Sequence, residues 1–197
     1  FSLPDVGIVV AGKIQSGKIK VGDKILINPQ FGTTKISAEV GSIEWQYKKV
    51  DDARHGMDVG LGLKNLSTSF AKRLIKKGYV VSPANNPILP IKTFEAELLV
   101  LDHPSEIRES YTPLLYCHQA RLPCRLVKLV TKLDPKTKKV LEQNPKTIKK
   151  GDRAVVLIEP QKPFVAETEK TVPAMGRFAL RDSNVTVAAG SILKINY

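Results

Sequence analysis

The sequence predicts an all-β fold made of two consecutive β-barrels. Short runs rich in valine, isoleucine and leucine recur along the whole chain, and glycine, proline, asparagine or aspartate separates each run from the next. The pattern contains no sustained helical period, apart from a possible helical turn near residues 67–76. Many short strands of this kind favour barrels, because a closed sheet has no exposed edge strand.

The expected strands follow one another from one end of the chain to the other. We predict them at residues 6–14, 24–28, 35–45, 58–64, 79–82, 93–101, 111–118, 121–133, 153–159, 163–167, 176–181 and 185–195. Residues 82–90 contain three prolines and two asparagines, which is typical of a linker. We therefore expect one barrel at residues 1–86 and a second at residues 87–197.

The composition predicts a folded, basic and cytoplasmic protein. The 197 residues carry a net charge of +12, which suits a polyanionic neighbour. Neither a signal peptide nor a long apolar run is found, so we expect no export and no membrane partner. Cys117 and Cys124 have an odd spacing that predicts side chains on opposite faces of a strand and its continuation. We therefore expect neither a disulfide nor a metal site.

Lysines are concentrated in one stretch of the second half. Residues 128–150 hold eight lysines and two carboxylates, Asp134 and Glu142. Such a run is typical of a solvated loop, but its charge also suits salt-sensitive contact with phosphate groups. The lysines that we select for phosphate contact are Lys136, Lys138, Lys139, Lys149 and Lys150.

Residues 176–181 predict a strand with two different faces. Phe178 and Leu180 share one face of the two-residue period, whereas Arg177 and Arg181 share the other. We expect the apolar pair in the core and both guanidinium groups on the outer face. Two interpretations of these arginines stay open: they engage a partner, or one of them pairs internally with Asp182 or another barrel carboxylate.

No pattern in the sequence predicts catalysis. Residues 12–18 fit the phosphate-loop spacing G-x-x-x-x-G-K, but Ile19 stands where serine or threonine must reach Mg²⁺. A strand pattern rather than a helix follows, so we interpret Ser16 and Gly17 as a hairpin turn. Cys117 and His118 are adjacent, and adjacent strand residues point to opposite faces. We expect no catalytic residue, no metal ligand and no cofactor in these residues, and no binding of GTP.

Short motifs occur in a fixed order along the chain. They include Val6-Gly-Ile-Val-Val-Ala-Gly12, Val21-Gly-Asp23, Phe94-Glu-Ala-Glu97, Leu101-Asp-His-Pro104, Tyr111-Thr-Pro113, Lys150-Gly-Asp152 and Met175-Gly-Arg-Phe-Ala-Leu-Arg-Asp182. The ordered set resembles the second and third domains of the elongation factor one-alpha superfamily. That superfamily includes the elongation factor, the eukaryotic class-two release factor and the ribosome-rescue GTPase that carries Pelota.

The resemblance implies a role in translation. The strings at residues 174–182 and 186–190 look closer to the release factor and the rescue GTPase. By contrast, residues 111–113 and 117–120 resemble the elongation factor, whereas residues 45–49 and 55–60 depart from it near its aminoacyl pocket. We favour a release or rescue factor; the alternatives are an elongation factor that delivers aminoacyl-tRNA and an unrelated basic β-barrel protein that binds nucleic acid.

The resemblance also implies which residues meet each partner. It implies that Gly176, Arg177, Arg181 and Asp182 bind a release factor or a Pelota-like protein, and that the five selected lysines contact ribosomal RNA. It further implies that a GTPase domain precedes these two barrels in the whole protein. GTP and Mg²⁺ are expected in that domain.

Overall fold

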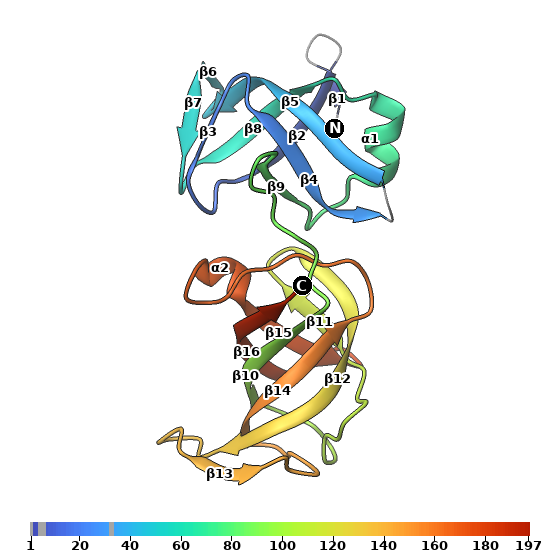
Figure 1. Ribbon diagram of the computed structural model, residues 1–197, viewed down its shortest axis with the longest axis vertical. Helices are drawn as coiled ribbons and strands as arrows, with labels where there is room; N and C mark the ends of the chain where they lie inside the picture. Colours follow the sequence, from blue (N-terminus) through green and yellow to red (C-terminus); the bar gives the residue numbers. More distant parts are fainter. Residues whose placement is uncertain (1, 4–6, 32–33) are drawn as a thin grey trace. The chain divides into compact units, whose positions relative to one another are not determined.

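The computed structural model describes residues 2–3, 7–31 and 34–197 (Figure 1). The chain forms two compact units, Phe1–Leu89 and Pro90–Tyr197, and we describe each unit by itself. Both units consist mainly of antiparallel strands, which confirms the predicted all-β fold class. No helix in the described part of the chain is long and apolar enough to cross a membrane.

The first unit contains a seven-stranded sheet and a separate two-stranded ribbon. The sheet has the order β1-β2-β8-β5-β4-β9, with β6 paired to β5, and the ribbon joins β3 to β7. The elements are β1 (Ser2–Leu3), β2 (Gly7–Lys13), β3 (Lys18–Lys20), β4 (Lys24–Phe31), β5 (Thr34–Trp45), β6 (Lys48–Val50), β7 (Asp52–Arg54), β8 (Asp58–Lys64), α1 (Thr68–Leu74) and β9 (Val80–Pro83). Isoleucines such as Ile25, Ile27 and Ile36 fill the core.

The segment that mimics a phosphate loop connects two strands. β2 ends at Lys13 and β3 begins at Lys18, so no helix N-terminus follows the glycines. The interpretation of Ser16 and Gly17 as a hairpin turn was wrong, because β2 pairs with β1 and β8 while β3 pairs with β7. The segment instead connects a strand of the seven-stranded sheet to a strand of the two-stranded ribbon. This was missed because sequence periodicity carries no information on which strands pair.

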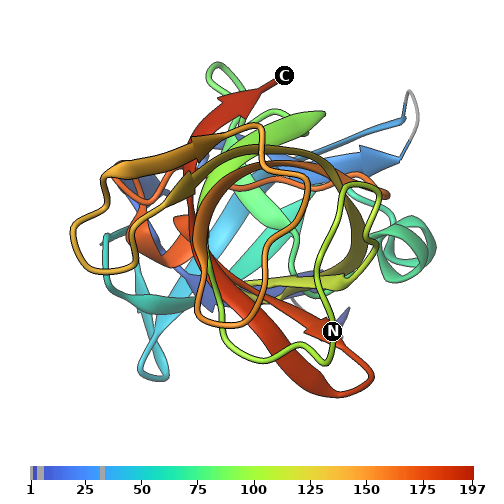
Figure 2. The ribbon, with the colours of Figure 1, turned by 90° about the horizontal axis from the view of Figure 1, so that it is seen from below.

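The second unit contains a closed six-stranded barrel. The pairing order is β11-β15-β16-β10-β14-β12, and β12 pairs again with β11, which closes the ring. Figure 2 shows the strands of this unit curving around a common centre. The elements are β10 (Thr93–Val100), β11 (Leu114–Cys117), β12 (Ala120–Leu133), β13 (Val140–Gln143), β14 (Arg153–Pro160), α2 (Pro173–Gly176), β15 (Arg177–Asp182) and β16 (Val185–Asn196).

Aromatic side chains fill the barrel of the second unit. Phe94 of β10 lies with its ring centroid 5.7 Å from that of Phe178 in an edge-on arrangement, and 6.4 Å from that of Phe164. Residues 163–167 are not a strand, contrary to prediction. They form a loop that is buried at residues 164–166, where the carbonyl of Phe164 accepts a hydrogen bond from the Ile91 amide. The apolar residues of this segment reflect burial of a loop, and they resemble the apolar run of a buried strand.

Both cysteines point into the core of the second unit. Cys117 lies on β11 and Cys124 on β12, two neighbouring strands of one hairpin, and both thiols are buried and free. The prediction of opposite faces was wrong, because His118 and Gln119 form a turn between the two strands. Burial raises the pKa of each thiol to about 12.

Candidate functional site

Strand β15 is the centre of the candidate site, and it lies between β11 and β16 in the closed barrel. Phe178 and Leu180 are 5% and 1% exposed, which confirms their predicted place in the core. Arg177 is exposed and Arg181 is half-buried, and both belong to the outer face of the strand. The predicted alternation of the strand is therefore correct, but its two arginines have different surroundings.

Arg177 is held by a carboxylate of its own fold. Its Nε donates to Glu169 Oε1 at 2.7 Å, and this hydrogen bond holds the pKa of Glu169 below its usual range. The Arg177 side chain nevertheless keeps 70% of its surface exposed. One guanidinium edge is thus tied to the loop before α2, while much of the group faces solvent.

Arg181 is held by the turn that follows β15 and by a tyrosine ring on β11. Its Nη2 donates to the carbonyl of Asn184 at 2.7 Å, which fastens it to the turn between β15 and β16. Its guanidinium carbon also lies 5.3 Å from the centroid of the Tyr116 ring. The guanidinium carbon of Arg121 lies 5.2 Å from the same ring, so Tyr116 contacts two cations.

We name Tyr116, Arg121 and Arg181 the arginine–tyrosine cluster. Tyr116 and Arg121 face each other across the β11–β12 hairpin, and Arg181 reaches the ring from β15. Sequence reasoning missed Tyr116 and Arg121, because the two-residue turn between their strands is His118-Gln119 and lacks the Asn-Gly or Asp-Gly signal of such hairpins. Without that sequence signal, the sequence does not indicate that Arg121 and Arg181 contact the same tyrosine ring.

Asp182 is engaged by a tyrosine from a distant segment. The Tyr111 hydroxyl donates to Asp182 Oδ2 at 3.0 Å, and the His103 ring packs edge-on against Tyr111 at 5.2 Å. Burial, and then the Asp182 carboxylate, raise the pKa of Tyr111. Ser183 Oγ also donates to Asp182 Oδ1 at 3.1 Å. Asp182 therefore closes the end of the strand, and it does not pair with either arginine.

Gly176 is required by close packing. A Cβ atom at this position would lie 2.2 Å from the backbone nitrogen of Glu169 and 2.4 Å from its Cα. No side chain fits there without movement of the backbone at residues 168–169. Gly176 thus lets the loop that carries Glu169 approach β15, which brings Glu169 within reach of Arg177.

The lysine-rich turn at residues 134–139 is well structured. Asp134 Oδ1 accepts hydrogen bonds from the amide and the hydroxyl of Thr137 and from the amide of Lys136, and these bonds lower the pKa of the aspartate. Lys138 lies 3.3 Å from Glu97 Oε1 through its Nζ, and Glu97 also pairs with Arg153. Within the described residues, Lys136 and Lys139 make no ion pair.

The second lysine turn, residues 149–152, is close to the first. Lys150 Nζ lies 2.9 Å from Asp102 Oδ1, whereas Lys149 has no ion pair in the described chain. Leu133 at the end of β12 pairs with Arg153 at the start of β14, so both turns lie at the same end of the barrel. Leu99 near the end of β10 pairs with Arg153 on one side, and Val100 pairs with Ala188 near the start of β16 on the other. The β15–β16 turn therefore lies at that end too.

One row of residues joins the lysine turns to Arg177. Glu97 faces Ser191 across β10 and β16, and Ser191 faces Arg177 across β16 and β15. Glu97 binds Lys138, while Arg177 binds Glu169. Lys138 and Arg177 therefore lie on one side of the barrel, a proximity that sequence spacing does not reveal.

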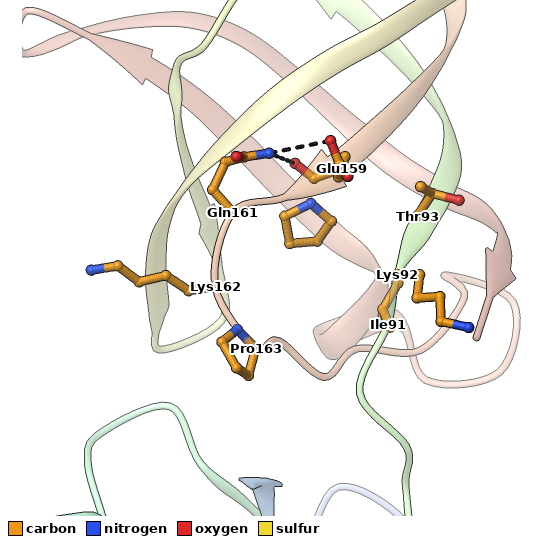
Figure 3. Close-up of a pocket in the computed structure, with 8 residues that line it drawn as sticks. Ile91, Lys92, Thr93, Glu159, Gln161, Lys162 and Pro163 are labelled. Carbon is orange, nitrogen blue, oxygen red and sulfur yellow. Dashed lines mark hydrogen bonds between the residues drawn. The ribbon is translucent and has the colours of Figure 1, made fainter. Parts of the chain in front are cut away.

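A pocket in the second unit lies outside this arrangement (Figure 3). It is lined by Ile91, Lys92, Thr93, Glu159, Pro160, Gln161, Lys162 and Pro163. Gln161 Nε2 donates to the backbone and side-chain oxygens of Glu159 at 3.4 and 3.3 Å, and Arg125 pairs with the same carboxylate at 2.7 Å. Glu159 is thus engaged by Gln161 and Arg125, whereas Lys92 and Lys162 make no ion pair among the described residues. The described residues also contain no group of three or more potential metal ligands.

Comparisons with known proteins match both units. Residues 7–82 match the family model for elongation factor Tu domain 2, and residues 93–193 match the model for the GTP-eEF1A C-terminal domain. Elongation factor 1-alpha of Archaeoglobus fulgidus is 40% identical over 195 residues, and that of Pyrococcus furiosus is 38% identical over 200 residues; each alignment covers 99% of this chain. The crystal structure of sup35 complexed with GDP superposes with a TM-score of 0.87 at 28% identity, over 99% of this chain and 46% of the other.

The fold and these matches define a class of protein: the paired β-domains of translational GTPases. The chain belongs to the elongation factor 1-alpha family, with residues 7–82 as its domain 2 and residues 93–193 as its C-terminal domain. Membership in this family removes the alternative of an unrelated nucleic-acid-binding barrel. The chain spans about half the length of the curated relatives, covering 44% of the Archaeoglobus and 46% of the Pyrococcus protein.

Proposed function

We propose that these two domains bind the cargo of a translational GTPase that delivers a release factor or a Pelota-like rescue factor to the ribosomal A site in the cytoplasm. The observation that carries this proposal is the outer face of β15, where Arg177 and Arg181 stand on one strand and are both held in place. Fixed guanidinium groups suit binding of a partner's carboxylates, because little side-chain entropy is lost when the complex forms.

The four residues predicted for the partner-binding site have different roles in this proposal. Arg177 and Arg181 meet the acidic groups of the partner through the exposed parts of their guanidinium groups. Asp182 and Gly176 act on the shape of the strand: Asp182 holds the strand end through Tyr111, and Gly176 admits the loop that carries Glu169. The arginine–tyrosine cluster extends the contact surface from β15 to β11 and β12.

We further propose that the two lysine turns contact ribosomal RNA. Lys136, Lys139 and Lys149 are exposed and make no ion pair in the described chain, so their full charge is available to phosphate groups. Lys138 and Lys150 are shared with Glu97 and Asp102, and we expect weaker phosphate contacts from them. Such contacts give affinity without sequence preference.

A second candidate is delivery of aminoacyl-tRNA. It is favoured by the curated relatives reported above, which bear the name elongation factor 1-alpha and are more similar in sequence than sup35. In either case we propose that hydrolysis of GTP, with its Mg²⁺, belongs to a GTPase domain outside these residues, and that the chain itself does not bind GTP.

Direct binding measurements separate the two candidates. The purified chain is titrated in turn with a class-one release factor, a Pelota-like protein and an aminoacyl-tRNA, each at the same salt concentration. Our proposal expects saturable binding of one of the two proteins, with loss of affinity in Arg181→Ala. Binding of aminoacyl-tRNA alone would overturn it in favour of the second candidate.

A further inference from the structure

Strand β13 forms an open edge of the second unit (Figure 1). It stands last in the strand order and pairs with β12 alone, so its other edge has no strand partner in the described chain. All four of its residues, 140–143, have exposed side chains. An open edge presents backbone N–H and C=O groups with which another extended segment can pair.

The edge strand is held in place at both of its ends. Before the strand, the Asp134 amide donates a hydrogen bond to the Lys139 carbonyl at 2.8 Å. After the strand, the Asn144 amide donates to the Val130 carbonyl at 2.9 Å. A strand that is already extended and fastened loses little conformational entropy when a second segment pairs with it.

Two aliphatic side chains stand next to each other on this strand. Val140 is 56% exposed and Leu141 is 58% exposed. Covering them removes apolar surface from water, which favours association. Edge strands that are protected against association often carry charged residues instead. The β13 edge therefore combines free backbone groups with an apolar surface.

The surroundings of the strand are positively charged. Residues 134–150 contain six lysines and two carboxylates. Lys139 directly before β13 and Lys146 shortly after it are exposed, and neither makes an ion pair within the described residues. Of the two carboxylates, Asp134 is engaged by its own turn, and Glu142 faces a lysine of β12 across the strand pair. This charge attracts a segment that is rich in carboxylates.

We propose that β13 docks an acidic, extended segment of a protein partner, which adds one strand to the open edge. The backbone of the segment pairs with β13, its apolar residues cover Val140 and Leu141, and its carboxylates lie near Lys139 and Lys146. This docking goes beyond the function proposed above. It depends neither on the cargo of the β15 face nor on contact between the lysine turns and RNA.

Three other occupants fit the edge less well. A second copy of this chain would bring its own lysines against these lysines, and like charges across an interface repel each other. RNA would meet the lysines, but its phosphates gain nothing from two aliphatic side chains. A lipid surface would leave the free backbone groups of the edge without hydrogen-bond partners. An acidic extended segment matches the backbone, the apolar side chains and the charge together.

The probe is an eight-residue peptide of alternating valine and glutamate, capped at both ends and labelled with a fluorophore. Its binding to the intact 197-residue chain is followed by fluorescence anisotropy. One comparison peptide has proline at two of the valine positions, so it keeps every glutamate but loses backbone donors of the strand. A second comparison peptide has lysine in place of each glutamate, which keeps the strand pattern and reverses the charge.

Substitutions in the chain separate apolar contact from charge. Val140→Thr combined with Leu141→Thr keeps strand-forming residues and removes aliphatic surface. We expect roughly 5- to 30-fold weaker binding of the acidic peptide and an unchanged melting temperature. Lys139→Gln combined with Lys146→Gln should weaken binding at low salt and have little effect at high salt, because salt screens exposed charges. The matched control, Leu193→Thr, removes a side chain of β16 that is 49% exposed and should leave the affinity unchanged.

Amide hydrogen exchange shows where the peptide binds. We expect the acidic peptide to slow exchange of the β13 amides, and both comparison peptides to bind more weakly. The proposal is overturned if the acidic peptide does not bind, if the proline peptide binds equally well, if β13 exchange is unchanged, or if the double threonine variant keeps full affinity. Dimerisation of the chain, or binding to vesicles of anionic phospholipid, that the threonine variant loses while no peptide binds would assign the edge to a second copy or to a lipid surface.

Discussion

Arg177 Nε donates to Glu169 Oε1 at 2.7 Å, which ties the start of β15 to the loop before α2. The loop comes this close because Gly176 has no side chain. Arg181, at the other end of the strand, is held by the carbonyl of Asn184 and by the Tyr116 ring. The two arginines of one face are therefore held by different residues, and separate substitutions can test the role of each.

Removal of the Glu169 partner tests whether Arg177 is a docking group or a structural one. In Glu169→Gln, we expect a melting temperature close to that of the wild type, because exposed ion pairs contribute little to stability. Partner affinity should fall less than in Arg177→Ala, since the guanidinium is still present but less well positioned. Both quantities are measured on the same preparations by thermal melting and titration. A large loss of stability with unchanged affinity would assign Arg177 to the fold alone.

The apolar face of β15 should control stability rather than binding. Phe178 packs edge-on against Phe94, and Leu180 is 1% exposed, so truncation of either to alanine leaves a cavity in the barrel. We expect each substitution to lower the free energy of unfolding by about 2–5 kcal/mol. Urea denaturation measures this loss. Affinity per folded molecule should stay the same, and a change in affinity without a stability loss would contradict the assignment of the two faces.

The alternation of these strands could be predicted because it depends on local sequence. Phe178, Leu180 and the two arginines that flank them follow the two-residue period that any strand imposes. Which strands pair is decided by long-range contacts. The sequence therefore could not predict that Tyr116 lies beside Arg181, or that β2 and β3 belong to different sheets. The helical turn near residues 67–76 was found as α1, whereas β13 was missed because its lysine-rich surroundings resemble a solvated loop.

The ion pairs of the lysine turns divide the selected lysines into two groups. Substitution of Lys136, Lys139 and Lys149 by glutamine should reduce the salt dependence of ribosome or RNA binding by roughly 0.7–0.9 in log–log slope for each lost phosphate contact. The matched control substitutes Lys138 and Lys150, which pair with Glu97 and Asp102, and we expect a smaller change per residue. Melting temperatures should change little in the first set. An unchanged salt slope there would exclude these lysines from phosphate contact.

The buried thiols predict how stability depends on alkaline pH. Burial raises the pKa of Cys117 and Cys124 from 9.0 to about 12 in the folded chain. The unfolded chain therefore loses these protons first, and the free energy of unfolding should decrease as pH rises above about 9. Denaturation curves at pH 8 and pH 10 measure the effect. A double Cys→Ala variant should show a weaker decrease, and an equal decrease would mean that other groups cause it.

The central claim is that the outer face of β15 binds a release or rescue factor, and Arg181→Ala tests it most directly. The affinity of the chain for a class-one release factor and for a Pelota-like protein is measured by calorimetry for wild type and variant, alongside their melting temperatures. We predict that the wild type binds one of these proteins, and that Arg181→Ala weakens binding by about 2–5 kcal/mol with a nearly unchanged melting temperature, if the contact is buried in the complex. Equal partner affinity of the wild type and of Arg181→Ala would contradict the claim. Binding of aminoacyl-tRNA, with no binding of either factor, would also contradict it.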